Sequence, residues 1–566
     1  MQRRICYLFC LVVIAVANLS FASQLSRPRF EIRFPPSLRA EPITGRVFVM
    51  ISRDNGSEPR FQAGAHYMGC PFFGVDVDQL QPASAAVIDS SSLGYPLRSL
   101  RDLPVGDYYV QAFVNVYTQF HRADGHTIWA HMDQWEGQSM FSSPGNVFSD
   151  VQKIHLDSSY VVKLQVTKII PPVAVPVDTS WVKHIKIQSE LLTKFWGRSI
   201  YLGAVILLPR DYDQHTDVSY PVDYEQDHFT LSPPYHFRED PPKAPPGTTL
   251  AMRQAEGYQL FKDWSSNNFP RMVMVNFLHP TPYFDDSYAV NSANNGPYGD
   301  AIMTELIPYI ETHFRIIRQP YARVLSGGST GGWESLALHV QHPEFFGGAW
   351  IYYPDPIDFR RWGLANIYED ENIFYAPGAT ATALGTTDWQ KVQRPWVRLP
   401  DGQMLVDFQQ EAQLEQVLGS KGRSGEQNDI WQAVYGPVGA DGYPKPLWNT
   451  STGVIDRDVA DYMRDHGYDL RFYMEKNWNT LGPKLVGKLH FYVGDMDHYY
   501  LNLAVYLTED FLKNTQRPYY AGTFDYGRPL QGHGKRPTSA GAMVRQMADE
   551  ITKNAPTGEL TSSWKY

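Results

Sequence analysis

The chain has 566 residues, a formal net charge of −10 at neutral pH and 14% aromatic residues. An acidic chain without a Lys/Arg block is not expected to bind nucleic acid, and the aromatic content excludes a disordered protein. Of the three cysteines, only Cys70 lies outside the N-terminal apolar segment, which excludes an internal disulfide or a thiolate metal cluster in the mature chain.

The N-terminus has the three parts of a secretory signal peptide. Arg3 and Arg4 precede an apolar run over residues 5–17, and small residues flank a cleavage position after Ala22. The run is shorter than the roughly 20 residues that cross a bilayer. We therefore expect residues 1–22 to be a cleaved signal peptide, and the mature protein to be secreted or periplasmic, without a membrane span.

Residues 29–168 are expected to form a β-sandwich domain. Runs rich in β-branched and aromatic residues at 45–51, 108–117 and 160–166 are separated by turn residues and show little helical periodicity. The proline-rich residues 169–180 suit neither a helix nor a central strand, so we expect a linker there.

Within residues 29–168, three histidines and two aspartates lie close together in the sequence, and both are residue types that bind metals. They are His121, Asp124, His126, His131 and Asp133. Asp124-Gly125 is also a hairpin signal, and a hairpin with histidines on its arms is the favoured interpretation. No metal and no other cofactor are expected.

From residue 181 onward, apolar runs alternate with helical patterns, which predicts an α/β fold with a mainly parallel sheet. Strands are expected at 201–208, 272–277, 323–326, 348–353 and 488–493. Helices are expected at 300–314, directly after residue 329 and around 544–551. One α/β domain should therefore comprise residues 181–355 and 481–555.

Residues 356–480 interrupt this alternation between two sheet strands. The segment holds six of the fourteen tryptophans, namely Trp362, Trp389, Trp396, Trp431, Trp448 and Trp478. We interpret it as a tryptophan-rich lid or cap. Most of these rings should form its own core, and the remainder could stack on a flat substrate ring.

Residues 327–331 read G-G-S-T-G and match the pattern G-x-S-x-G. An apolar strand precedes the pattern and a helix follows, which is the context in which a serine at a sharp turn acts as a nucleophile. The same turn directs the helix N-terminus and the Thr330 N–H toward developing oxyanion charge. A phosphate-binding glycine turn is the alternative, but the lysine of a P-loop is missing. We predict that Ser329 is a nucleophile.

A serine nucleophile needs a base and an acid that orients the base. In α/β folds that carry the serine on such a strand–turn–helix, the acid follows the serine in the chain and the base follows the acid. Asp497, after the strand at 488–493, is the first choice for the acid; Asp495 is the second and Asp355 the third. His533 lies in a loop 36 residues beyond Asp497 and just before the final helix. It is therefore the predicted base.

Two other histidines, His490 and His498, are rivals to His533. His490 should point out of a sheet strand, and His498 is too close to Asp497 in sequence to face it easily. For the second oxyanion donor, we expect the loop after the strand at 272–277, which makes Leu278 or His279 the candidate beside Thr330.

Four segments resemble the Putative esterase family, which contains esterase D, feruloyl esterases and the antigen 85 mycolyltransferases. These segments are residues 296–300, 305–311, 327–334 and 342–346. The resemblance covers residues 201–353 well and 488–533 loosely. It implies an α/β-hydrolase fold, a Ser-Asp/Glu-His triad, no metal and hydrolysis of carboxylic esters. Thr330, where the family often has Met, and the long lid depart from its pattern, and the N-terminal region lies outside it.

The leading hypothesis is a secreted serine esterase with a β-sandwich ahead of its catalytic domain. Its substrate would be an ester, either a small molecule or linked to a polysaccharide, with aryl or carbohydrate-linked esters favoured. A serine peptidase on the same fold is one alternative. A carbohydrate- or surface-binding protein that kept the fold without activity is the other, although the intact set of Ser329, Asp497 and His533 counts against it.

Overall fold

The computed structural model describes residues 28–64, 69–131, 139–157, 159–174, 176–228, 230–284, 286–376, 392–559, 561 and 564. The expected signal peptide and Trp389 lie outside these residues. Two compact units are present. The first comprises Met1–Tyr117, Gly145–Pro171 and Gln416–Leu418, and the second Thr118–Pro144, Pro172–Glu415 and Gly419–Tyr566, within the described residues.

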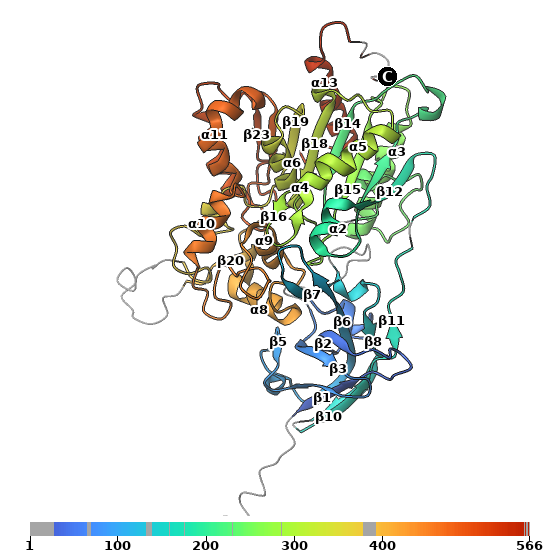
Figure 1. Ribbon diagram of the computed structural model, residues 1–566, viewed down its shortest axis with the longest axis vertical. Coiled ribbons are helices and arrows are strands. Elements are labelled where there is room, and N and C mark those ends of the chain that lie inside the picture. The colour runs from blue at the N-terminus through green and yellow to red at the C-terminus, as the bar shows by residue number, and fades with distance from the viewer. Residues whose placement is uncertain are drawn as a thin grey trace, which may run out of the picture. The chain divides into compact units, whose positions relative to one another are not determined.

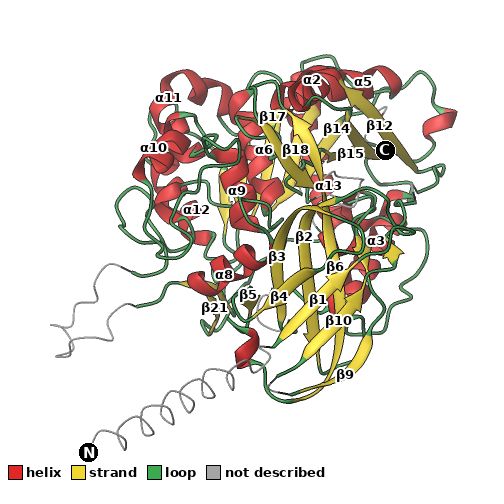
Figure 2. Cartoon of the chain, turned by 60° about the horizontal axis from the view of Figure 1, so that its bottom comes forward, coloured by secondary structure: helices red, strands yellow, loops and turns green. Residues whose placement is uncertain are grey.

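The first unit is built mainly from strands of two sheets (Figure 2). A three-stranded sheet has the order β10-β1-β4, from β1 (Arg29–Arg33), β4 (Ala86–Asp89) and β10 (Val161–Gln165). An eight-stranded sheet has the path β11-β8-β6-β2-β3-β5, with β7 and β9 also paired to β6; β7 belongs to the second unit. The strands of this sheet are β2 (Ile43–Ser52), β3 (Phe72–Leu80), β5 (Leu93–Tyr95), β6 (Gly106–His121), β7 (Thr127–His131), β8 (Val147–Phe148), β9 (Gln152–Leu156) and β11 (Lys168–Ile169).

Side chains from both sheets share one apolar cluster. Phe30 and Ile32 of β1 are buried together with Val47 of β2 and Val110 of β6. In β1 every second residue is buried, as in a strand with one face on a core and the other in solvent. The hydrophobic pattern along the N-terminal strands therefore accounts for this unit's core.

The second unit contains an eight-stranded sheet of order β12-β13-β15-β14-β18-β19-β22-β23 (Figure 1). Its strands are β12 (Val182–Ser189), β13 (Ile200–Leu207), β14 (Val222–Gln226), β15 (Val273–Leu278), β18 (Arg323–Gly328), β19 (Gly348–Tyr352), β22 (Leu489–Tyr492) and β23 (Thr523–Asp525). β13 runs opposite to the other seven described strands of this sheet. This mainly parallel sheet confirms the predicted α/β architecture.

Seven of the described helices of the second unit lie between or after the strands of this sheet in the chain. They are α2 (Glu190–Trp196), α3 (Thr249–Trp264), α4 (Tyr298–Ala301), α5 (Ile307–His313), α6 (Thr330–Gln341), α12 (Asn502–Lys513) and α13 (Ala540–Asn554). A π-helical turn, Ile302–Leu306, separates α4 from α5, so the single helix predicted at 300–314 is not regular. Pro308 follows at once and has no N–H for a regular helical bond, which gives the wider turn a physical reason.

The segment between β19 and β22 folds into small elements of its own. They are β20 (Pro395–Arg398), β21 (Met404–Asp407), α8 (Phe408–Leu418), α9 (Gln427–Tyr435), α10 (Arg457–Asp465) and α11 (Leu470–Leu485). All five of its described tryptophans are at most 7% exposed. These rings form a core, so none of the five offers an open platform to a flat substrate.

Strand β14 was not predicted from the sequence, because its alternating polar residues do not look like a strand covered on both faces. Asp223 and Glu225 are nonetheless buried, at 0% and 3% exposure. Asp223 accepts a hydrogen bond from the Ser326 hydroxyl at 2.8 Å, and Glu225 lies 3.7 Å from Arg536. Burial raises the pKa of Asp223 to about 7 and that of Glu225 to about 8.

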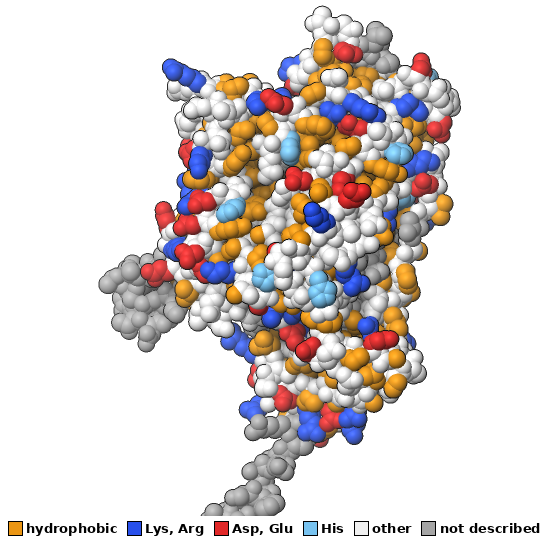
Figure 3. All heavy atoms as spheres, in the orientation of Figure 1, with side chains coloured by type: hydrophobic (Ala, Val, Ile, Leu, Met, Phe, Trp, Pro, Cys, Tyr) orange, Lys and Arg blue, Asp and Glu red, His pale blue; other side chains and the backbone are white. Residues whose placement is uncertain are grey.

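Charged side chains of both signs share the face shown in Figure 3, where Lys and Arg side chains are interspersed with Asp and Glu. Among the described residues, we find no helix with the length and apolar character that a membrane crossing needs.

The raised pKa of Asp223 predicts a pH-dependent stability. The folded state keeps a proton on this carboxyl up to about pH 7, whereas an unfolded chain releases it near pH 4. The free energy of unfolding should therefore fall as pH rises through this window, by on the order of 1 kcal/mol per pH unit. Urea unfolding from pH 5 to pH 8 should show a shallower decline for Asp223→Asn than for the wild type. Parallel curves would show that Asp223 stays ionised in the fold.

Candidate active site

Ser329 lies at a sharp turn between β18 and α6. Its φ of 58° is unusual for a residue with a side chain, and such strain persists only where the surroundings hold it. Two glycines allow the close packing. A Cβ on Gly331 would lie 2.0 Å from the Gln226 carbonyl oxygen, and one on Gly327 would lie 2.3 Å from the Gly331 carbonyl oxygen. The predicted strand–turn–helix context is present.

Asp497 and His533 form a direct hydrogen bond, with 2.7 Å between Asp497 Oδ2 and His533 Nδ1. Asp497 follows β22 and is completely buried. Its second oxygen, Oδ1, accepts the backbone N–H groups of Tyr499 at 2.9 Å and Leu501 at 3.3 Å. Because both oxygens are bonded, the carboxylate is fixed in place and can orient the imidazole. The structure thus brings these two predicted residues together.

Asp495, the second candidate for the acid, supports the histidine loop instead. Its carboxylate accepts the backbone N–H groups of Gln531 at 2.8 Å and Leu530 at 3.3 Å, shortly before His533. The His533 ring itself packs edge-on against Tyr353, with 4.8 Å between the ring centroids. Asp495 therefore stabilises the loop that carries His533, and its carboxylate bonds that loop's backbone rather than the imidazole.

Asp355, the third candidate, lies beside the serine rather than the histidine. The Ser329 hydroxyl donates to Asp355 Oδ1 at 3.3 Å. Asp355 is 2% exposed, and burial raises its pKa, while its bonds from Tyr288 and Trp431 and the nearby His228 and His533 oppose that rise. Asp497 therefore bonds the predicted base, His533, and Asp355 bonds the predicted nucleophile, Ser329.

The order of the strands places one of the predicted oxyanion residues, Thr330, next to Ser329 and the other two, Leu278 and His279, farther away. Thr330 opens α6 directly after Ser329, so its N–H lies at the positive end of the helix dipole. Leu278 ends β15, which is separated from β18 by β14. The His279 ring is completely buried, where its Nδ1 accepts the Ser287 N–H at 3.1 Å. Leu278 and His279 are therefore not on the strand next to the nucleophile.

In the structure, the loop after β14, and not the loop after β15, lies beside the strand that carries Ser329. Gln226 pairs with Gly327 of β18, and the Asp227 nitrogen lies 3.0 Å from where a Cβ of Gly331 would be. His228 Nε2 is 3.3 Å from Thr330 Oγ1. Sequence analysis missed these residues because it counted β15 as the third strand after overlooking β14.

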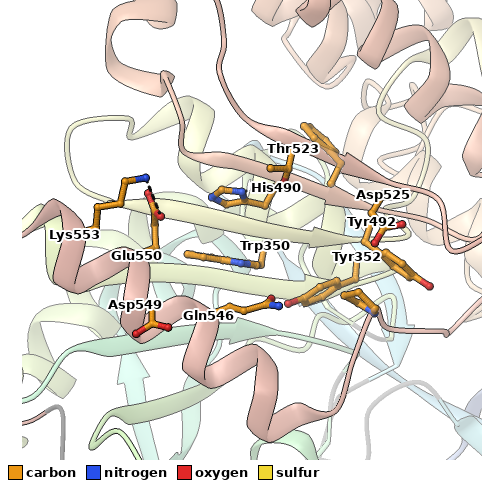
Figure 4. A pocket seen from close by; sticks show the side chains of 12 residues that line it. Trp350, Tyr352, His490, Tyr492, Thr523, Asp525, Gln546, Asp549, Glu550 and Lys553 are labelled. Atoms are coloured by element: carbon orange, nitrogen blue, oxygen red, sulfur yellow. Dashed lines mark hydrogen bonds and ion pairs between the residues drawn. The ribbon is translucent and has the colours of Figure 1, made fainter.

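A separate cavity of about 520 Å³ lies between the sheet and α13 (Figure 4). Trp350 and His490 stack on each other in its wall, with 4.7 Å between their ring centroids. Burial lowers the pKa of His490 to about 4, so this rival histidine is neutral at neutral pH. Neither Ser329 nor His533 is among the described residues that line this cavity.

The histidine-rich stretch before the second unit's sheet is a hairpin, as predicted. β6 and β7 pair, the Arg122 N–H bonds the His126 carbonyl oxygen at 2.9 Å, and Gly125 has a φ of 89°. In the part of the chain that the structure describes, no group of three or more His, Cys, Asp or Glu side chains is placed to hold a metal ion.

Comparison with protein families matches residues 279–354 to the family described as Putative esterase. The matched segment contains the Ser329 turn and α6, and it ends one residue before Asp355. This finding confirms the resemblance seen in the sequence motifs. The comparison with curated proteins found no match.

Several solved structures are similar to the chain at low identity. A ferulic acid esterase is 13% identical, and the match covers 66% of this chain and 98% of that one, with a TM-score of 0.34. An S-formylglutathione hydrolase from Agrobacterium tumefaciens is 10% identical, over 66% and 96%, with a TM-score of 0.31. A fluorophosphonate-binding serine hydrolase from Staphylococcus aureus is 13% identical, over 65% and 98%, with a TM-score of 0.30.

The geometry separates the two buried carboxylates in a testable way. Asp497→Asn should lower kcat/KM for a chromogenic ester by roughly 10⁴, because the amide would hold the imidazole in the wrong tautomer. Asp355→Asn should cost on the order of 10 to 100, because Asp355 touches the serine and not the base. The reverse order of the two losses, measured on folded variants, would make Asp355 the acid.

Proposed function

We propose that the chain, which carries an esterase segment, is a secreted serine carboxylic-ester hydrolase that works through Ser329, His533 and Asp497. The 2.7 Å bond between His533 and Asp497 is the observation that carries this proposal. It leaves His533 Nε2 to accept a proton, and Ser329 follows β18 at the same edge of the sheet where Asp497 follows β22.

In the proposed reaction, Ser329 Oγ attacks the ester carbonyl carbon while His533 takes the hydroxyl proton. Asp497 stabilises the imidazolium that forms. The tetrahedral intermediate collapses as the C–O bond to the alcohol breaks, and His533 gives its proton to the leaving oxygen. Water, deprotonated by His533, then attacks the acyl-enzyme and releases the acid and the free serine.

The negative charge on the former carbonyl oxygen needs donors that are already in place. We assign the Thr330 N–H as one donor, since it lies at the start of α6. The second is a backbone N–H of Asp227 or His228, because β14 is hydrogen-bonded to β18 and its loop packs against Gly331.

Secretion and the domain roles are also part of the proposal. The sequence of residues 1–22 supports export of the mature chain from the cytoplasm. The shared core of the two N-terminal sheets supports a β-sandwich domain at residues 29–168, followed by a linker at 169–180. Residues 356–480 would form the lid of the catalytic domain.

A preference for aryl or carbohydrate-linked esters is the finer part of the proposed specificity. The described lid tryptophans are buried and do not support it. It should therefore be tested by comparing kcat/KM for phenolic, sugar-linked and aliphatic esters of equal size. A ranking led by aliphatic esters would contradict it.

Replacement of the nucleophile tests the proposal itself. Ser329→Ala should lower the rate by on the order of 10⁶ if the three residues act as a unit, with no loss of fold. A fluorophosphonate probe should label the wild type and not the variant. Equal labelling of both proteins would rule out Ser329, and a wild type without activity on any ester would favour a peptidase or a non-catalytic role.

A further inference from the structure

The inserted segment between β19 and β22 reaches the candidate catalytic residues at two places. The first is Asp355, whose Oδ2 accepts four hydrogen bonds. The donors are Tyr288 Oη at 2.7 Å, Thr330 Oγ1 at 3.1 Å, Trp431 Nε1 at 3.1 Å and Gln427 Nε2 at 3.3 Å. Two of these four, Trp431 and Gln427, belong to α9 of the inserted segment.

These bonds matter because Asp355 is buried and touches the nucleophile. A buried carboxylate is stable only when donors replace the water that it has lost. Four donors on Oδ2 fix the plane of the carboxyl group, and this leaves Oδ1 facing the Ser329 hydroxyl. The position of the Ser329 side chain in this structure therefore depends in part on contacts that the inserted segment supplies.

Trp431 is itself held by the core of that segment. Its ring packs edge-to-face on Trp362, with centroids 4.9 Å apart, and on Trp396 at 6.0 Å. Its N–H also lies 2.7 Å from Tyr288 Oη, so one indole group contacts both partners of the cluster. The buried tryptophans thus give α9 a rigid base from which to hold Asp355.

The second contact is on the acid side of the site. Arg398, at the end of β20, donates from Nε to the Asp497 carbonyl oxygen at 2.9 Å. Its backbone N–H bonds the His498 carbonyl oxygen at 2.9 Å, and its guanidinium lies 4.1 Å from the centre of the Tyr500 ring. The loop that carries Asp497 is therefore clamped by the inserted segment.

We propose that the inserted segment completes the catalytic centre, with Trp431 and Gln427 as positioning residues for Asp355 and Ser329, and Arg398 as the positioning residue for the Asp497 loop. This inference rests on the proposed function. It differs from the role of a lid, because a lid acts on substrates that touch it. A positioning segment affects every substrate, including one too small to reach the insertion.

The smallest chromogenic ester separates the two roles. Displacing a reacting group by about 1 Å can cost on the order of 100-fold in rate without weakening substrate binding. Loss of positioning should therefore lower kcat for p-nitrophenyl acetate and leave KM nearly unchanged. A segment that only covers the pocket would instead alter KM for bulky esters.

The test compares two tryptophan variants of the full-length protein. Trp431→Phe keeps a buried ring and removes the N–H that Asp355 accepts. Trp448→Phe is the matched control, because Trp448 is 2% exposed in the same segment and packs on Phe408, with 5.4 Å between the ring centroids. We expect Trp431→Phe to lower kcat and the rate of fluorophosphonate labelling about tenfold or more, with KM within twofold, and Trp448→Phe to match the wild type.

Two further variants keep the test decisive if Trp431→Phe is poorly folded. Gln427→Ala removes a half-buried donor without opening the core and should lower kcat severalfold. Arg398→Met should lower kcat about tenfold, and Arg398→Lys, which keeps a donor, should restore part of the loss.

An active wild type whose kcat on p-nitrophenyl acetate is unchanged in the Trp431, Gln427 and Arg398 variants would overturn this inference alone. Changes confined to KM for bulky esters would overturn it as well, in favour of a covering lid. A wild type that is neither active nor labelled would overturn the proposed function, and this inference with it.

Discussion

The close approach of three backbone segments at Ser329 is the constraint on which the rest of the site depends. β14, β18 and the first turn of α6 meet so tightly that a side chain at Gly331 would collide with the Gln226 carbonyl group. This packing holds Ser329 at a positive φ and brings the loop after β14 beside Thr330. One contact thus positions both Ser329 and the proposed oxyanion donors, while His533 and Asp497 come from two other loops.

Burial and hydrogen bonding then decide what each carboxyl group can do. Asp497 has both oxygens bonded and faces the imidazole, whereas Asp355 faces the serine and is held by the inserted segment. Asp223 and Glu225 lie deeper in the sheet, and burial raises the pKa of each. One carboxyl group therefore bonds the His533 imidazole, a second accepts the Ser329 hydroxyl, and others are buried deep in the sheet with a raised pKa.

The features that could be predicted from the sequence are those that depend on a local residue pattern or on the order of elements along the chain. The turn at Ser329, the strand before Asp497 and the loop of His533 all follow from apolar runs and their order. β14 was overlooked because Asp223 and Glu225 gain their partners, Ser326 and Arg536, only through the fold. The prediction of Leu278 and His279 as oxyanion residues was made without β14, which lies between β15 and β18. The contact of Trp431 with Asp355 joins residues 76 positions apart, and no local pattern encodes it.

The central claim is that a covalent acyl group forms on Ser329. Rapid acid quenching of the enzyme during turnover of a p-nitrophenyl ester, followed by peptide mass mapping, tests it most directly. The account predicts an acyl adduct on the peptide that contains Ser329, formed together with a burst of nitrophenol equal to the enzyme concentration. An adduct on another residue, or steady turnover with neither burst nor adduct, would contradict it.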